Sequence, residues 1–571
     1  MKIVDKLTLA KYLNQYISQL EIDEIESLIE IPSVEINYTY AFPCYKLAKH
    51  ERKDPNSIAE DLSNKLPIPD FIEELEASGP YLNFRVKAEY TLGNIFELKE
   101  DYAKLRDELR DESFKPLKIV IEYPAPNTNK PLHFGHIRNM LIGSTISKLF
   151  NYVGHQVYQV NLYNDRGIHI CKSMLAYKKW GNNQEPDIKS DHFVGRSYVR
   201  YNLEEEKDET LKEEILTMLK LWEQRDPETR QLWEKMNQWA LNGFKETYKE
   251  LDISFEKEYF ESDLYLKGKE KVLDGLNKGI FVKRDDGAII AELKENVGLP
   301  DKVLLRSDGT SIYITQDIYL AYQKKEDYNY DRSIYVVGNE QDLYFKQLFA
   351  VLDLIGFKED KYHFSYGMVS LPEGKMKSRE GTIVDADDVI EEIKSLALNE
   401  VSKRYPDLSD EEKNQRADII GKAALRFFIL KFSPKSEFVF NPKESISFEG
   451  ETGPYIQYVY ARIESIIEKS TVDINLDVDY SLLQHEKELA LIKYLNYFPE
   501  KMEQAIRTYG IHLIPQYLLT LCQLFNSFYS SCIVISEDKD LEAARLLLIK
   551  CVQIVIKTGL NLLGIKTLNK M

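Results

Sequence analysis

Apolar residues recur along this chain with two spacings, and each spacing predicts a type of secondary structure. The run IVI at 119–121 has no polar interruption and is typical of a strand buried on both faces. Apolar residues three and four positions apart then follow from Leu141 to Leu149 and predict a helix. A second apolar run, at 157–160, predicts another buried strand. Strand, helix and strand in succession indicate a parallel, doubly wound α/β sheet.

The middle of the chain, from about 186 to 300, breaks this alternation. A 4-3-4 spacing of apolar residues over 211–222 predicts a helix. Asp-Gly pairs at 286–287 and 308–309, each flanked by β-rich residues, predict hairpins. The alternation resumes with the apolar run at 334–337. We therefore interpret 186–300 as an insertion within the α/β domain.

The two ends of the chain differ from this centre. The first hundred residues combine apolar helical spacing with a turn and strand at 79–86, and a charged, helical stretch at 99–112 follows. From 451 onward the pattern is helical almost throughout, which predicts a bundle. The chain thus divides into a small N-terminal α/β domain (1–112), a Rossmann-like catalytic domain (113–385), a connecting helical segment (386–450) and a helical bundle (451–571).

Composition narrows the functional classes. A chain of 571 residues is too long for one core, and its 43% hydrophobic content suits several packed domains. No apolar run approaches the roughly 20 residues that span a bilayer, and the start does not resemble a signal peptide. The five cysteines are scattered without a Cys-x-x-Cys pair, so we expect reduced thiols in a cytoplasmic protein and no structural zinc. The net charge of −18 argues against a nucleic-acid coat but permits an RNA enzyme with local basic contacts.

The candidate chemistry lies directly after the first strand, in the stretch KPLHFGH at 130–136. His133 and His136 are three residues apart and face the same side of a helix start, where free N–H groups attract anions. A metal site is one alternative, but no third ligand stands at a supporting spacing. Two ordinary surface histidines are the other. The preceding strand and Lys130 favour a nucleotide-phosphate site.

Several separated motifs resemble class I aminoacyl-tRNA synthetases in the form typical of arginyl-tRNA synthetases. The first signature of that family resembles the stretch at 122–136, and the second resembles a stretch about 240 residues later. The resemblance covers essentially the whole chain. The matching stretches are GPYLNFRV at 79–86, EYPAPNTNKPLHFGH at 122–136, YITQD at 313–317, NEQD at 339–342, KMKSR at 375–379 and ETGPYIQYVYAR at 451–462.

The resemblance implies a two-step reaction. ATP and L-arginine give arginyl-adenylate and pyrophosphate, and the arginyl group then passes to the 3′ end of tRNA(Arg). In that family the first step usually requires bound tRNA, so we expect this dependence here. ATP would act with Mg²⁺, the partners would be tRNA(Arg), arginine and ATP, and the protein would be a monomer that binds neither DNA nor a membrane.

The resemblance also assigns roles to single residues, since phosphate transfer needs cationic or N–H donors and a guanidinium needs carboxylates. No metal ligand is among them. The implied catalytic residues are Lys130, His133, His136, Lys375 and Lys377. The implied ATP-binding residues are His133, Gly135, His136, Lys375, Met376 and Ser378. For arginine they are Glu122, Asn127, Tyr313, Asp317 and Gln341, and for tRNA they are Asn83, Tyr458, Arg462 and Met571.

Two departures from the family pattern matter. The second signature normally has a lysine at its fourth position, where this chain has Ser378. We therefore expect Lys130 to be the main charge donor, with Lys375 and Lys377 assisting. The second departure is NDRG at 164–167, where the family commonly has a GDWG-like turn, so a packing aromatic is lost.

Other functions compete with this interpretation, the nearest being another class I synthetase. A class I synthetase for cysteine is disfavoured by the lack of zinc-type cysteines, and one for glutamate by the acidic pocket. A non-enzymatic tRNA-binding relative would have no need of Lys130 and the two histidines. A smaller nucleotidyltransferase would leave the helical C-terminal third unexplained.

Overall fold

The computed structural model describes residues 3–104, 115–370 and 384–571. The chain forms two units, which we call the helical unit (1–115, 400–431 and 444–571) and the α/β unit (116–399 and 432–443).

The α/β unit is built on a five-stranded parallel sheet with strand order β11-β10-β4-β5-β6. The chain runs outward from β4 through β5 to β6 and returns on the other side of β4 with β10 and β11. The order therefore reverses beside β4, and ligands bind at the carboxyl ends of strands at such a point. The predicted strands and the doubly wound sheet are confirmed. The strands are β4 (Lys118–Glu122), β5 (Gln156–Tyr163), β6 (Lys257–Phe260), β10 (Arg332–Gly338) and β11 (Asp360–Tyr366).

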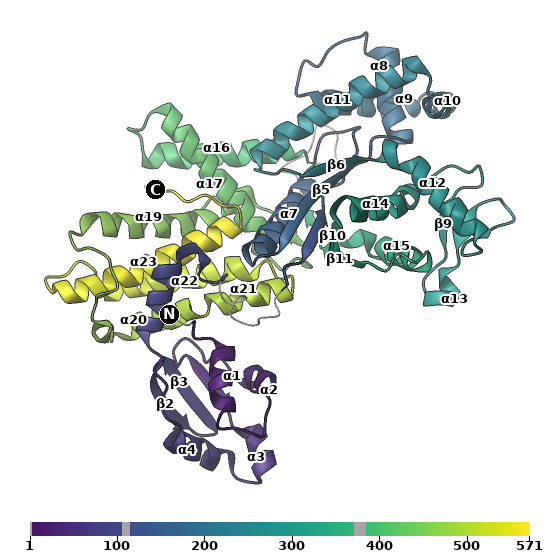
Figure 1. Cartoon of the computed structure of the whole chain (residues 1–571). Helices are drawn as coiled ribbons and strands as arrows, with labels where there is room; N and C mark the ends of the chain where they lie inside the picture. Colours follow the sequence, from purple (N-terminus) through teal and green to yellow (C-terminus); the bar gives the residue numbers. More distant parts are fainter. Residues whose placement is uncertain (1–2, 105–114, 371–383) are drawn as a thin grey trace. The chain divides into compact units, whose positions relative to one another are not determined.

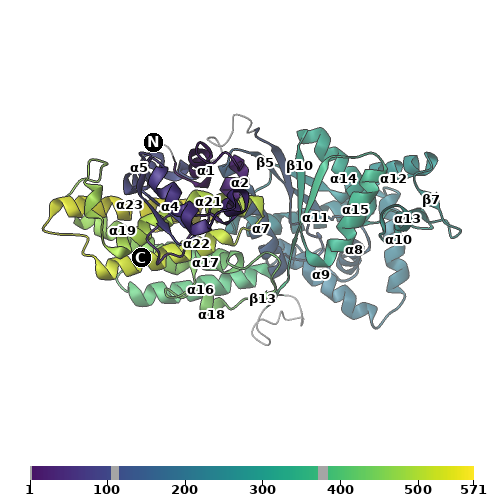
Figure 2. The same ribbon diagram turned by 90° about the horizontal axis from the view of Figure 1, so that it is seen from below.

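Helices cover both faces of this sheet, as Figures 1 and 2 show. Helix α7 (Phe134–Tyr152) lies on one face and buries its stripe from Leu141 to Leu149, as predicted. Helices α14 (Tyr313–Tyr328) and α15 (Asp342–Leu354) lie on the other face, above a core that includes Val120, Ile318 and Leu348.

Helical hairpins separate β5 from β6 and pack against one another (Figure 1). The helix predicted over 211–222 is confirmed as α10, with its 4-3-4 positions buried. The Asp226 side chain caps α11 by accepting from the backbone N–H of Thr229 at 2.9 Å, just before a proline at the first helical position. These helices are α8 (Ile168–Trp180), α9 (Ser190–Glu205), α10 (Leu211–Glu223) and α11 (Pro227–Glu250).

The segment after β6 contains a second, small antiparallel sheet of order β7-β8-β9. Both predicted hairpin turns lie at its strand ends. Strand β6, however, falls inside the range 186–300 and belongs to the main sheet, so this range is not one uninterrupted insertion. Its four residues are too few to show in the hydrophobic pattern. The elements here are α12 (Glu261–Asn277), β7 (Val282–Lys283), β8 (Ile289–Ala291), α13 (Leu293–Val297) and β9 (Lys302–Leu305).

The segment that links the units begins beside the main sheet. Strand β12 (Val369–Ser370) pairs in parallel with β13 (Phe438–Val439). Arg138 of α7 donates to the backbone oxygens of Pro434 and Ser436 at 3.0 and 2.9 Å and so fixes the second of these segments. The helices of this segment are α16 (Ala386–Arg404), α17 (Asp410–Leu430) and α18 (Pro442–Ser445), whereas the short turn η2 (Asn339–Gln341) lies between β10 and α15.

The C-terminal part of the helical unit is all-helical, as predicted. Thr452 caps α19 by accepting from the N–H of Tyr455 at 3.2 Å. The long last helix buries an apolar stripe from Leu546 to Leu560. Its helices are α19 (Gly453–Lys469), α20 (Glu486–Asn496), α21 (Phe498–Arg507), α22 (Leu513–Ser531) and α23 (Lys539–Leu562), with a short turn η3 (Tyr480–Leu482).

The N-terminal part of the helical unit is a small α/β domain with an antiparallel sheet of order β1-β3-β2. It is fixed to the bundle by buried hydrogen bonds, including Tyr497 Oη to the oxygen of Thr39 at 2.6 Å. Of the predicted stretch 99–112, residues 105–112 lie outside the described residues. The elements are α1 (Lys6–Asn14), α2 (Ile22–Leu28), β1 (Tyr40–Pro43), α3 (Tyr45–Glu51), α4 (Pro55–Lys65), β2 (Ile72–Ser78), β3 (Tyr81–Val86), α5 (Ala88–Leu98) and η1 (Lys99–Asp101).

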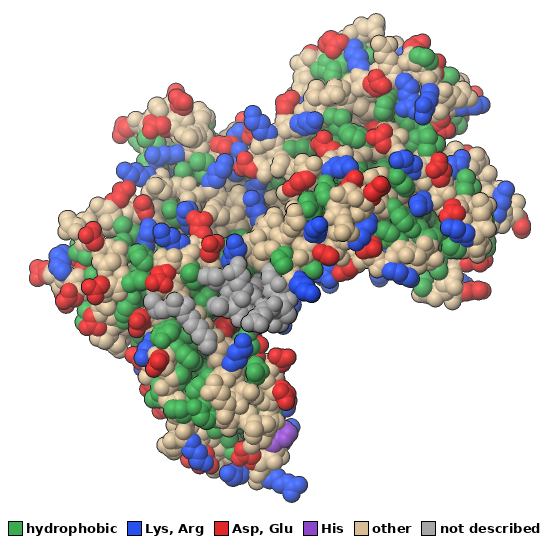
Figure 3. Space-filling model, viewed as in Figure 1, with side chains coloured by type: hydrophobic (Ala, Val, Ile, Leu, Met, Phe, Trp, Pro, Cys, Tyr) green, Lys and Arg blue, Asp and Glu red, His purple; other side chains and the backbone are tan. Residues whose placement is uncertain are grey.

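Three properties complete the description of the fold: the state of the cysteines, the polarity of the helices and the distribution of surface charge. All five cysteines are free and buried. Within the described ranges, every helix is too short or too polar to cross a bilayer. On the face drawn in Figure 3, basic and acidic side chains are interspersed.

Candidate active site

The two histidines of the first signature meet at the start of α7. His133 has extended backbone and immediately precedes the helix, and its N–H donates to Nδ1 of His136 at 3.0 Å. The two rings lie against each other, with centroids 3.8 Å apart. Because Nδ1 of His136 accepts a hydrogen bond from the backbone, the neutral ring carries its own proton on Nε2. His136 therefore presents a hydrogen-bond donor from the helix start.

Among Lys130, His133 and His136, only Lys130 carries a positive charge at pH 7. Burial lowers the pKa of His133 to about 4, and the charge of Lys130 adds to the shift. Burial, with smaller effects from His133 and Lys130, holds the pKa of His136 well below its usual value. Both imidazoles are thus neutral at pH 7. Burial also lowers the pKa of Lys130, whose ammonium is the positive charge of this group.

Gly135 is required by the position of the His133 ring. A Cβ atom at residue 135 would lie 3.0 Å from both Cε1 and Nδ1 of that imidazole. We expected Gly135 to let a nucleotide approach the backbone, and the structure adds that glycine leaves room for its neighbour.

The chain that follows the second signature returns to the first signature. The N–H of Phe134 donates to the oxygen of Val384, and the N–H of Ala386 donates to that of Leu132, both at 2.9 Å. His133 and Asp385 thus face each other in a short antiparallel bridge. The second-signature residues themselves, Lys375, Met376, Lys377 and Ser378, lie outside the described residues.

Glu122 ends β4 at the carboxyl edge of the sheet and is buried. Its Oε2 accepts from Nζ of Lys324 at 2.7 Å, and that ammonium also donates to Oγ of Ser333 at 3.1 Å. Lys324 is fully buried and lies 3.7 Å from the ring centroid of Tyr335. One oxygen of Glu122 is therefore already paired with an internal cation.

Asp317 lies one turn after the start of α14, and the hydroxyl of Tyr344 donates to its carboxylate. Burial raises the pKa of Asp317 to about 7, with the Tyr344 hydrogen bond opposing the shift and the charge of Glu122 adding to it. Such a carboxyl group is poised to ionise when a cation binds beside it.

The other predicted arginine-binding residues are less buried than Glu122. Tyr313, one turn before Asp317 on the same helix, is 53% exposed. Gln341 is exposed in the turn η2 after β10. Asn127 is half-buried in the loop after β4, where it forms an isolated parallel bridge with Asn164.

Glu261, which sequence reasoning missed, belongs to the same group of carboxylates. It follows β6 directly and is only 5% exposed, and its Oε2 has no hydrogen-bond partner among the described residues. Burial raises the pKa of Glu261 to about 8; Arg166 opposes the shift, and the charges of Asp165 and Asp317 add to it. Its signal was its place at the carboxyl end of a parallel strand, which the short β6 concealed.

In the stretch NDRG at 164–167, which departs from the family pattern, Arg166 makes the packing contacts. Arg166 lies 4.0 Å above the ring centroid of Tyr265 and forms an ion pair with Glu223 at 2.9 Å. Asp165 accepts from both the N–H and the hydroxyl of Ser262, at 2.8 and 2.6 Å. A guanidinium packed on an aromatic ring thus stands where the family commonly has an aromatic side chain.

These groups form two adjoining chemical environments at the carboxyl edge of the sheet. Lys130 and the histidines provide a cation and donors that suit phosphates. Glu122, Glu261 and Asp317 provide partly desolvated carboxyl groups that suit a cationic substrate. Because Glu122 acts on Asp317 and Asp317 on Glu261, the acidic group behaves as one coupled set.

The predicted tRNA-binding residues lie in the helical unit. On α19, Nη2 of Arg462 donates to the Tyr458 hydroxyl at 2.8 Å, and Nη1 donates to Oδ1 of Asn526 at 3.2 Å. Both side chains are half-buried. Asn83 is buried in the central strand β3, between Ala41 and Glu76. Met571 is partly buried at the end of the chain.

Comparisons with known proteins match every part of this architecture. Residues 103–442 match the model of the class I tRNA synthetase (R) catalytic domain. Residues 456–571 match the DALR anticodon binding domain, and residues 7–86 match the arginyl tRNA synthetase N-terminal domain.

Individual relatives agree over nearly the full length. The arginine–tRNA ligase of Treponema denticola is 43% identical, over 93% of this chain and 92% of that protein. That of Bacteroides thetaiotaomicron is 39% identical over all of both chains. The solved arginyl-tRNA synthetase of Thermus thermophilus has a TM-score of 0.77 at 29% identity, covering 93% of this chain and 94% of that one.

Proposed function

The chain belongs to the arginyl-tRNA synthetase family, and from this premise we propose which residues carry out its reaction. It is a ligase that joins L-arginine to tRNA, and its class I catalytic domain uses ATP. The observation that carries the residue assignments is the pairing of a cationic helix start at Lys130 with a buried acidic group at the same sheet edge.

In the activation step, a carboxylate oxygen of arginine attacks the α-phosphorus of ATP, and the bond to the pyrophosphate oxygen breaks. Negative charge grows on the phosphate oxygens and on the departing pyrophosphate. Lys130 would neutralise this charge, while Nε2–H of His136 and the imidazole of His133 would donate to the phosphates. ATP would enter as its magnesium complex, with the ion held mainly by the phosphates.

Recognition of arginine would use the coupled carboxyl groups. A guanidinium presents paired donors that carboxylates accept in a bidentate manner. Asp317 and the free oxygen of Glu261 are the best-supported partners, because Glu261 is buried, Asp317 is half-buried, and desolvation raises the pKa of both carboxyl groups. Glu122, Asn127, Tyr313 and Gln341 would hold the rest of the substrate, with one oxygen of Glu122 held by Lys324.

The second signature would assist the first. Lys375 and Lys377 would supplement Lys130 at the phosphates, and Met376 and Ser378 would contact the nucleotide. Their support is the resemblance of the motif, together with the backbone pairing of residue 384 to the first signature.

The tRNA would be bound by the remaining parts of the chain. We assign the elbow contacts to residues 1–112, catalysis to 113–385, the connection to 386–450 and the anticodon to 451–571. Tyr458 and Arg462 offer an aromatic ring beside a cation, a combination that binds unstacked bases. Met571 would contact the same RNA region, and Asn83 the elbow. The enzyme would act as a cytoplasmic monomer.

Isotopic pyrophosphate exchange tests this scheme. With each amino acid offered in turn, exchange should occur with arginine alone and should require tRNA(Arg). Exchange with arginine in the absence of tRNA would overturn the proposed tRNA dependence. Exchange with another amino acid would overturn the acidic-pocket assignment.

A further inference from the structure

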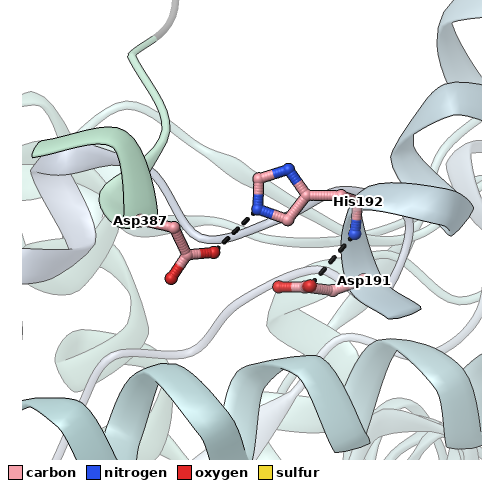
Figure 4. A group of neighbouring side chains, drawn as sticks. All are labelled: Asp191, His192 and Asp387. Carbon is pink, nitrogen blue, oxygen red and sulfur yellow. Dashed lines mark hydrogen bonds and ion pairs between the residues drawn. The ribbon is translucent and has the colours of Figure 1, made fainter. Parts of the chain in front are cut away.

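Asp191, His192 and Asp387 form a cluster whose donor atoms all lie within 4.8 Å of one another (Figure 4). Asp191 and His192 come from the first turn of α9, and Asp387 comes from the first turn of α16. Two carboxylates and an imidazole are a common donor set for a divalent transition metal. The surroundings of the cluster decide whether it is such a site.

An internal ammonium already occupies the cluster. Nζ of Lys189 lies 2.6 Å from Oδ2 of Asp387 and 3.4 Å from Oδ2 of Asp191. The same Oδ2 of Asp387 is 2.7 Å from Nε2 of His192, and its Oδ1 accepts from the Thr247 hydroxyl at 3.0 Å. Both oxygens of Asp387 are thus engaged by donors. A metal would have to displace the lysine, so these residues do not fit a metal site.

The pKa shifts within the cluster agree with an internal ion-pair network. Although burial opposes both shifts, the hydrogen bond between His192 and Asp387 raises the pKa of His192 and lowers that of Asp387. The charges of Asp191 and Asp385 also favour the imidazolium, while Lys189 favours the Asp387 carboxylate.

The cluster holds a segment that contacts the catalytic histidines. Asp387 directly follows residues 384–386, which pair through two 2.9 Å backbone hydrogen bonds with residues 132–134. Lys189 and His192 at the start of α9, and Thr247 on α11, therefore hold Asp387 next to the bridge that pairs with His133.

Helix α9 also contacts the first signature directly. A Cβ atom at Gly195 would lie 2.7 Å from Cδ of Pro131 and 3.6 Å from Cα of Lys130, so the helix packs closely on this loop. The contacts close a ring, from the Lys130 loop to residues 384–387, on to α9, and back to the loop. Within such a ring, displacement of one segment shifts the others.

We propose that Lys189, His192 and Asp387 are positioning residues for adenylate formation, with the Lys189 ammonium in the place that a metal would otherwise take. They touch no substrate and act through residues 384–386 and α9 on His133 and Lys130. The proposal rests on the phosphate-binding roles proposed above for Lys130 and His133.

The first test compares Asp387→Asn and Lys189→Met with Lys172→Met. The control removes an ion pair between α8 and α9, Lys172 to Glu205 at 2.8 Å. Among the described residues, the hydrogen-bond partners of these two side chains are Asn202 and Tyr201, which lie outside residues 384–387. In arginine-dependent pyrophosphate exchange with tRNA present, the two cluster variants should lose about 10- to 100-fold in kcat/KM for ATP. KM for arginine should stay within about twofold, and Lys172→Met should resemble the wild type.

Active-site titration and thermal unfolding separate positioning from general instability. If the variants only lower the active fraction or the unfolding temperature, with KM for ATP and kcat per active site unchanged, the positioning role is refuted. If Lys130→Ala also leaves exchange intact, the proposed function fails as well, which distinguishes the two failures.

Substitutions of His192 and a titration with Co²⁺ complete the test. His192→Gln keeps an N–H donor for Asp387 and should retain most of the ATP-dependent rate, whereas His192→Leu should behave like Asp387→Asn. Co²⁺ added to the wild type without ATP should give no visible ligand-field bands. Bands that appear in the wild type and vanish in His192→Gln would show a metal site and overturn the proposal.

Discussion

The N–H of His133 donates to Nδ1 of His136 over 3.0 Å, so one histidine of the first signature fixes the tautomer of the other. The two nitrogens of His136 therefore have separable roles: Nδ1 accepts from the backbone at the helix start, and Nε2–H is left as a donor. Two substitutions divide these roles, because asparagine imitates the position of Nδ1 and glutamine that of Nε2.

We predict that His136→Asn keeps the cap and loses the phosphate donor. Its kcat for pyrophosphate exchange should fall about 100- to 1,000-fold, the range for removing one transition-state donor. Its unfolding free energy should change by less than about 1 kcal/mol, since a capping acceptor remains. His136→Gln should show the reverse, with more activity and lower stability. Equal kinetic losses in both variants would contradict the division of roles.

Lys130 should be the principal cation of the activation step. Because both histidines are neutral, Lys130→Ala removes the only described positive charge proposed for the phosphates, and kcat/KM for ATP should fall at least about 100-fold. Lys377→Ala is the comparison, measured in the same exchange assay. An unchanged rate would make Lys377 a bystander, whereas a loss that matches or exceeds that of Lys130→Ala would contradict the primacy of Lys130.

Gly135→Ala tests the packing of the His133 ring. The new Cβ would start 3.0 Å from two ring atoms, so the imidazole must shift by a few tenths of an ångström. We expect a loss of about 10-fold or more in kcat with little change in KM for arginine, because small misplacements of catalytic groups are costly. Wild-type exchange kinetics would show that the ring position is not critical.

Much of the fold was predictable because its signals are local. The strand at 119–121, the helix from Leu141 to Leu149 and the helix over 211–222 each follow from apolar spacing, and the structure confirms them. Strand β6 was missed since its four residues, Lys257–Phe260, carry only a short alternation. Its membership in the main sheet depends on pairing with β5, which is a non-local property.

The candidate site also has a part that local sequence predicts and a part that depends on non-local contacts. Lys130, His133 and His136 are contiguous in sequence, so their motif was visible without a structure. Glu261 was not, because its burial and its coupling to Asp317 arise only when β6 and α14 meet at one sheet edge. The Lys189 ammonium among the donors of Asp387 was equally invisible, since the two residues are 198 positions apart.

Tyr458 should contribute to tRNA binding through its ring. Tyr458→Ala should raise KM for tRNA about 5- to 100-fold, which corresponds to the stacking of one base. Tyr458→Phe keeps the ring and loses only the acceptor for Arg462, so its KM should stay near that of the wild type. Aminoacylation kinetics with tRNA(Arg) measure both, and an equal effect of the two substitutions would instead assign the role to the hydroxyl.

Arginine binding should depend on pH through Asp317, whose pKa is raised to about 7 by burial. A bound guanidinium favours the ionised carboxylate, so it lowers this pKa and releases a proton. Affinity should therefore rise with pH from 5.5 toward 7.5, by up to about tenfold per pH unit for each coupled carboxyl group. Calorimetric titration in buffers of different ionisation enthalpy would measure the proton release directly.

Two variants establish which group titrates. Asp317→Asn should weaken binding and remove its share of the pH slope, leaving only that of Glu261, whose pKa should fall below its wild-type value of about 8 because the charge of Asp317 is gone. Tyr344→Phe removes the hydrogen bond that lowers the pKa of Asp317, so the midpoint of the pH dependence should move upward from about 7. Wild-type affinity that is constant between pH 5.5 and 7.5 would show that neither carboxyl group is protonated in the free enzyme. The buried acids would then bind arginine as fixed charges, and the Tyr344→Phe variant should show no shift of any midpoint.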